Sequence, residues 1–100
     1  MRILCRIVVS LLGINLCFGM SPKEACEEEM QLAKMIMDLR QRDEPQVKLL
    51  SLAQGDAYLE HMVRSAYDES VQKNSEDRTQ VSAHFSLRVY EGCLAALDHG

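Results

Sequence analysis

Three histidines and four cysteines are the residues of this chain most able to do chemistry. A thiolate beside an imidazole can act as a nucleophile, and either side chain can bind a metal. However, His61, His84 and His99 lie far apart in the sequence, and none of the patterns Gly-x-Ser-x-Gly, His-Glu-x-x-His or Cys-x-x-Cys occurs. We therefore expect a protein that is not an enzyme and that uses no cofactor and no bound metal.

The methionines offer a second route to chemistry, because thioether sulfur binds soft metals in exported proteins. Met30, Met35 and Met37 lie close together in the sequence, and His61 is followed by Met62. Helical spacing places Met30 and Met37 on an apolar face, where methionine commonly fills a core, and Met35 among polar residues. We favour core packing over metal binding for these residues.

The first 19 residues have the pattern of a signal peptide. Arg2 and Arg6 supply positive charge beside an apolar stretch, residues 7–18, that is too short to span a bilayer. A small-x-small site at residues 17–19 predicts cleavage before Met20. We therefore expect a signal peptide over residues 1–19 and a single helical domain over residues 20–100, exported to the periplasm or, as the alternative, outside the cell.

Removal of the leader decides which cysteines remain. Cys5 and Cys17 are lost with it, and Cys26 and Cys93 stay. An exported domain with two cysteines most often carries one disulfide, although two free thiols or a metal site are alternatives. Lipidation of Cys17 and an uncleaved membrane anchor are further alternatives, but Leu16 is bulky where a lipidation site needs a small residue.

The expected domain is acidic. Two of the eleven Lys and Arg residues belong to the leader, whereas all fifteen Asp and Glu residues follow it, so the domain has a net charge of −6. Such a charge disfavours nucleic acid, and the domain lacks the basic amphipathic face that binds anionic membranes. We expect another protein as the partner, no stable membrane insertion after cleavage, and a homodimer as the alternative assembly.

The domain has helical period throughout, and no segment alternates long enough to form a strand. Ser21 and Glu24 form a capping box at the first helix, and Asp56 and Ser75 are predicted N-caps further along. We predict an all-α fold, a small bundle of about four helices, over residues 22–42, a short segment from residue 45 to about 53, and residues 57–71 and 76–97.

Apolar faces predict how these helices pack. The last helix is apolar around most of its circumference, so we expect it to be the centre of the bundle. In the short helix, Val47, Leu50 and Ala53 are expected to face inward. The first helix has one apolar face and one polar arc, and the polar arc includes Gln41.

The predicted topology brings the two cysteines together. In an up-down-up-down bundle the end of the last helix returns beside the start of the first. Cys26 lies in the first turns of the first helix and Cys93 in the last turns of the last one. We therefore predict a Cys26–Cys93 disulfide that acts as a structural staple.

Two charged residues, Glu29 and Arg40, intrude on the apolar face of the first helix. A guanidinium facing a core needs a carboxylate or several carbonyl groups as partners. Glu29 is too far from Arg40 on the same helix, at about 16 Å along its axis. Because the first and third helices should be parallel, we predict a buried ion pair between Arg40 and Glu69.

Glu27, Glu28 and Glu29 make the start of the first helix acidic. Negative charge near a helix N-terminus complements the helix dipole, and this is the interpretation that we favour. The functional alternative is that Glu27 and Glu28 form a patch for a basic partner.

A pattern of short motifs runs through the domain. It comprises Cys26 near the start of a helix, Ile-Met-x-x-Arg-Gln at residues 36–41, an Ala-Tyr pair at residues 66–67, and a closing Phe…Tyr-x-x-Cys from Phe85 to Cys93. This pattern resembles a group of small exported bacterial helical proteins of unassigned function. The resemblance implies export and the disulfide pattern, and it implies no activity.

We therefore expect a non-catalytic periplasmic binding module of the inhibitor, immunity or exclusion type. The alternative is a structural or stress-related envelope protein that self-associates.

Overall fold

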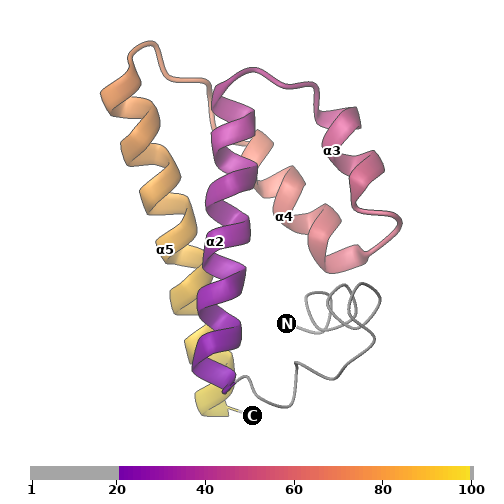
Figure 1. The fold of residues 1–100 in the computed structure, drawn as a ribbon, viewed down its shortest axis with the longest axis vertical. Coiled ribbons are helices and arrows are strands. Elements are labelled where there is room, and N and C mark those ends of the chain that lie inside the picture. The colour runs from indigo at the N-terminus through magenta and orange to yellow at the C-terminus, as the bar shows by residue number, and fades with distance from the viewer. Residues whose placement is uncertain (1–20, 100) are drawn as a thin grey trace.

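A computed structural model of the chain describes residues 21–99, which form four helices and confirm the predicted all-α fold (Figure 1). The predicted signal peptide lies outside these residues. The helices are α2 (Pro22–Gln41), α3 (Gln46–Leu52), α4 (Ala57–Tyr67) and α5 (Ser75–His99).

α2 begins where the capping box of Ser21 and Glu24 predicts. The Glu24 N–H donates to Ser21 Oγ at 3.1 Å, and the Ser21 N–H donates to the Glu24 carboxylate at 3.4 Å. The helix ends at Gln41, and Asp43 then adopts a φ of 63°, which lies outside helical backbone geometry.

The inward face of α3 agrees with the prediction at Leu50 and Ala53 but not at Val47. Leu49 and Ala53 are buried and Leu50 is half-buried, whereas Val47 is 73% exposed. The prediction for Val47 is therefore wrong. Leu49 and Ala53 lie four residues apart on one face, and this two-turn helix packs on α4 along that face.

α4 begins as predicted, with the Leu59 N–H bonded to the Asp56 side chain at 3.1 Å. It ends at Tyr67, four residues earlier than the predicted Val71. Side chains of α2 bind main-chain groups of residues 69–72, so this segment leaves the helix and Glu69 lies in the turn that follows it.

α5 begins one residue earlier than predicted. The cap is Asn74 rather than Ser75, because the Asn74 side-chain oxygen accepts from the Asp77 N–H at 2.8 Å. Asn is as good an N-cap as Ser, and Ser75 becomes the first residue of the helix.

Pairs of contacting residues give the helix directions. Glu29 meets Tyr58 and Arg40 meets Glu69, a constant offset of 29 residues, so α4 runs parallel to α2, as predicted. Cys26 meets Cys93 and Asp38 meets Ser82, so α5 runs antiparallel beside α2 (Figure 1).

The centre of the bundle is α2, which packs on both α5 and α4, so the prediction that α5 is central is wrong. α4 and α3 are too short to cover both sides of a helix as long as α5. Within residues 21–99, no helix has both the length and the apolar character needed to cross a membrane. The buried core consists of Ala33, Ile36, Met37, Leu49, Met62, Val63, Ala66 and Phe85.

Candidate functional site

Cys26 and Cys93 form the predicted disulfide, with their Cα atoms 5.6 Å apart. Cys26 is fully buried. The bond joins the N-terminal end of α2 to the C-terminal part of α5. Both cysteines of residues 21–99 are in this bond, so neither is a nucleophile in the folded domain.

The buried charge of Glu29 lies beside the disulfide. Its carboxylate accepts a hydrogen bond from the Tyr58 hydroxyl, and its second oxygen lies 3.6 Å from the Cys93 Sγ. Burial, followed by the neighbouring Glu29 carboxylate, raises the pKa of Tyr58 above its usual range. Glu29 and Tyr58 therefore tie α2 to α4 at the disulfide end of the bundle.

This pair predicts the response of the domain to alkaline pH. Because the folded state holds the Tyr58 proton more tightly than the unfolded state does, stability is fully present below about pH 10 and falls as the pH rises further. An ultraviolet difference titration should give Tyr58 a pKa above that of an ordinary tyrosine. Glu29→Gln, which removes the charge and keeps an acceptor, should lower that pKa; an unchanged titration would contradict the assigned partner.

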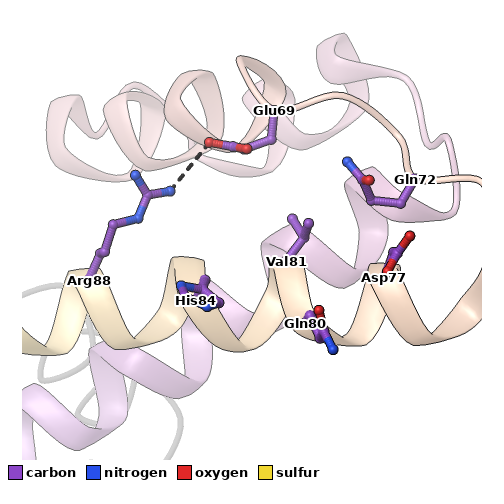
Figure 2. Close-up of a pocket in the computed structure, with 7 residues that line it drawn as sticks. All are labelled: Glu69, Gln72, Asp77, Gln80, Val81, His84 and Arg88. Carbon is purple, nitrogen blue, oxygen red and sulfur yellow. Dashed lines mark hydrogen bonds and ion pairs between the residues drawn. The ribbon is translucent and has the colours of Figure 1, made fainter.

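A groove lies between α5 and the end of α4. It has a volume of about 430 Å³, and a second hollow of about 370 Å³ continues it, because Glu69 and Arg88 line both. Figure 2 shows the α5 residues of the first hollow, with Glu69 and Gln72 facing them from the segment after α4. The remaining lining residues are Asp77, Gln80, Val81 and His84 in the first hollow and Ser65, Asp68, Phe85 and Val89 in the second.

The floor of the groove consists of its apolar lining residues, Val81 in the first hollow and Phe85 and Val89 in the second, and its rim consists of the polar and charged ones. Val81, Phe85 and Val89 follow one another at intervals of four residues along α5, which places them on one face. Arg88 lies over the Phe85 ring, 5.9 Å from its centroid, and its guanidinium meets the Glu69 carboxylate at 3.3 Å. This exposed ion pair crosses the groove and separates its two hollows; such a pair contributes only about 0–1 kcal/mol.

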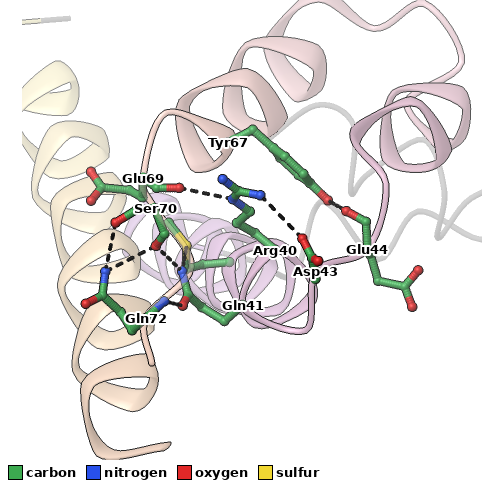
Figure 3. A network of polar contacts seen from close by, with 9 residues as sticks. Arg40, Gln41, Asp43, Glu44, Tyr67, Glu69, Ser70 and Gln72 are labelled. Atoms are coloured by element: carbon green, nitrogen blue, oxygen red, sulfur yellow. Dashed lines mark hydrogen bonds and ion pairs between the residues drawn. The ribbon is translucent and has the colours of Figure 1, made fainter. Parts of the chain in front are cut away.

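The prediction of a buried Arg40–Glu69 ion pair is wrong in its chemistry, although the two residues meet. The Arg40 Nε donates to the main-chain oxygen of Glu69 at 3.0 Å (Figure 3), while the Glu69 carboxylate pairs with Arg88 (Figure 2). Arg40 also lies 4.8 Å from the centroid of the Tyr67 ring and 3.9 Å from the Asp43 carboxylate. Because α4 ends before Glu69, the carbonyl is free of helical bonding and takes the place of the carboxylate.

Arg40 therefore acts as a clamp on the main chain, and the expected mutant behaviour changes. Arg40→Met should lower the free energy of unfolding by about 1–2 kcal/mol, because a charged donor and a cation–π contact are lost. Adding Glu69→Leu should recover none of this loss, since the carbonyl remains. Urea denaturation of both variants checks this, and recovery in the double variant would restore the carboxylate as the partner.

Gln41 also holds the segment after α4, residues 69–72, and the sequence pattern does not predict this role. It was assigned to the polar arc of α2, yet it is 5% exposed. Its side-chain amide donates to the Ser70 carbonyl at 3.0 Å, and its oxygen accepts from the Gln72 N–H at 2.7 Å (Figure 3). Arg40 and Gln41 together hold residues 69–72, the segment that forms one side of the groove.

The remaining candidates lie away from this groove. Glu28 is exposed and Glu27 is half-buried, on different sides of α2. Met37 is fully buried, as predicted, whereas Met35 is 53% exposed. No group of three or more His, Cys, Asp or Glu residues within residues 21–99 is arranged to hold a metal ion.

Comparison with known proteins finds no family model, no curated protein and no solved structure that matches this chain. The resemblance to small exported bacterial helical proteins stays a prediction from the sequence.

Proposed function

We propose that this chain is a small exported binding module of the periplasm that acts without catalysis, and that its α4–α5 groove receives a segment of a partner protein. The observation that carries the proposal is the groove itself, in which an apolar floor lies between charged rims. Protein-binding surfaces commonly combine an apolar centre with a polar rim.

The supports of the groove favour binding by a preformed surface. Its α5 side is fixed to α2 by the disulfide, and its other side is fixed by Arg40 and Gln41. A wall ordered before binding reduces the entropy that association costs. The Glu69–Arg88 pair is exposed, so a partner can replace it without a large loss of stability.

The charged groups of the groove support binding more than acid–base catalysis. Glu69 is paired with Arg88, and the Asp77 carboxylate accepts from the Asn74 side chain at 3.0 Å. Carboxylates that are held in place by such partners can recognise charged groups of a binding partner. An inhibitor, immunity or exclusion role is consistent with this arrangement.

Co-purification from periplasmic extract tests the proposal. The wild type should retain a stoichiometric heterologous protein, and Val81→Arg, which puts a charge on the floor, should lose it. Val47→Arg is the matched control, because Val47 is 73% exposed on α3, away from the groove. His84→Glu changes an exposed rim residue without touching the core and should also weaken retention.

The same experiment distinguishes the proposed binding module from the alternative function. Recovery of a self-associated species alone would favour a structural or stress-related envelope protein. Retention of a partner by Val81→Arg and His84→Glu, with both variants folded by circular dichroism, would exclude the groove as the binding site.

A further inference from the structure

α5 carries two adjacent stripes: one packs on α2, and the other, which is apolar, is only partly covered. Ser82 and Cys93 bond to side chains of α2, and Ser86 and Val89 lie between them along α5, at intervals of four, three and four residues. The outer stripe, shifted by one residue, repeats the same spacing on the flank away from α4. It consists of Ala83, Leu87, Tyr90, Leu94 and Leu97.

The outer stripe has the geometry of a helix-packing seam. Intervals of four and three residues keep side chains in line with a neighbouring helix, and the stripe extends about 21 Å along α5. Leu87, near its middle, is 48% exposed, and Ala83 is exposed. Tyr90, Leu94 and Leu97 are half-buried, so a further helix would cover apolar surface already gathered in a line.

Acidic residues border the outer stripe on both sides. Glu91 lies three residues before Leu94 on the outer edge of α5 and is exposed. On α2, Asp38 accepts a hydrogen bond from Ser82, and Glu27 lies eleven residues earlier on the same face, within a turn of the level of Leu94. Lys34 lies between them and pairs with Asp38 at 2.8 Å, so Glu27 is the acidic residue that this edge offers to a basic partner.

Charge makes a second copy of the chain a poor occupant. Antiparallel pairing of two outer stripes about a two-fold axis would centre on Tyr90 and bring Glu91 close to Glu91 of the second copy. Each domain also carries a net charge of −6. A single helical stripe covers less than the roughly 800 Å² per partner of a standard interface, so little apolar area would offset this repulsion.

We propose that the outer stripe binds an amphipathic helix of another protein, with apolar residues at heptad spacing and Lys or Arg on their flanks. This inference rests on the proposed role as a binding module but uses a surface separate from the α4–α5 groove. A substitution in the groove should therefore not affect binding at the outer stripe, and a substitution in the outer stripe should not affect binding in the groove.

Three synthetic peptides about as long as α5 test it by calorimetry on the purified protein. The first has leucines at heptad spacing flanked by lysines, the second replaces lysine by glutamate, and the third keeps the lysines but scrambles the leucines. We expect saturable one-to-one binding of the first, and affinities lower by about tenfold or more for the others. Equal binding of any two peptides would overturn the proposal.

Matched substitutions locate the binding. Leu87→Glu should weaken binding of the lysine peptide by about tenfold or more, whereas Met35→Glu, at a similarly exposed position of α2, should not. Glu27→Gln should weaken it by about two- to threefold at low salt, and Glu28→Gln should leave it unchanged. Full binding by Leu87→Glu, or sedimentation that reveals a dimer dissociated by Leu87→Glu, would reject the basic helix as the occupant.

Discussion

Replacing Cys26 and Cys93 together by alanine should lower the free energy of unfolding by about 4 kcal/mol, the loop-entropy value for a bond of this span. The bond closes a loop across 67 positions and joins the first and last helices of residues 21–99. A domain of this size has a stability of only about 5–10 kcal/mol, so the variant should be close to unfolded at physiological temperature.

Urea denaturation with circular dichroism measures this loss. The wild type treated with a reductant is the first control, because it opens the same bond without changing a side chain. Met35→Ala is the second, since Met35 is exposed and lies on the other side of α2. A loss below about 1 kcal/mol would mean that the helices hold their positions without the bond.

The disulfide was predictable because topology alone places its ends together. A capping box starts α2, helical period continues to Gln41, and three reversals of direction between the four helices return the end of α5 to Cys26. None of these steps needs the rotation of a helix about its axis. Local signals and chain direction were enough.

The larger errors concern what lies beside a helix, although the end of α4 is also four residues earlier than predicted. The prediction for Val47 fails because α3 is too short for its apolar pattern to decide which face is buried. The prediction that α5 is the centre of the bundle requires its whole apolar circumference to be covered, whereas Leu87 in its outer stripe is exposed. An apolar face predicts contact, but it does not say whether the contact is within the chain.

The wall of the candidate site was the least predictable part. Arg40 was expected to need a partner, and it has one, but a main-chain carbonyl supplies it. Main-chain acceptors leave no trace in the sequence, because any residue type offers one. Gln41 was missed for the same reason, since both of its partners in residues 70–72 are main-chain groups.

Gln41→Leu should accordingly lower the free energy of unfolding by about 2 kcal/mol, more than most polar substitutions do. Leucine keeps nearly the same volume at a buried position, so the loss reports hydrogen bonds rather than a cavity. The Gln72 N–H would lose its partner, and an unsatisfied group costs about 1–3 kcal/mol where water cannot replace the bond. The Ser70 carbonyl would lose one hydrogen bond but keep the one from the Gln72 side chain.

The same substitution should loosen one side of the groove and leave the helices in place. Hydrogen exchange at residues 69–72 should increase in Gln41→Leu, while exchange near the disulfide stays slow. Gln72→Ala is the matched control, because it removes an exposed side chain bonded to Ser70 and keeps the main-chain N–H that Gln41 binds. If Gln72→Ala destabilises as much as Gln41→Leu, the segment is held by its own side chains. Faster hydrogen exchange at residues 69–72 together with weaker retention of the partner, in Gln41→Leu alone, would show that the buried Gln41 side chain of α2 orders the side of the groove that the partner contacts.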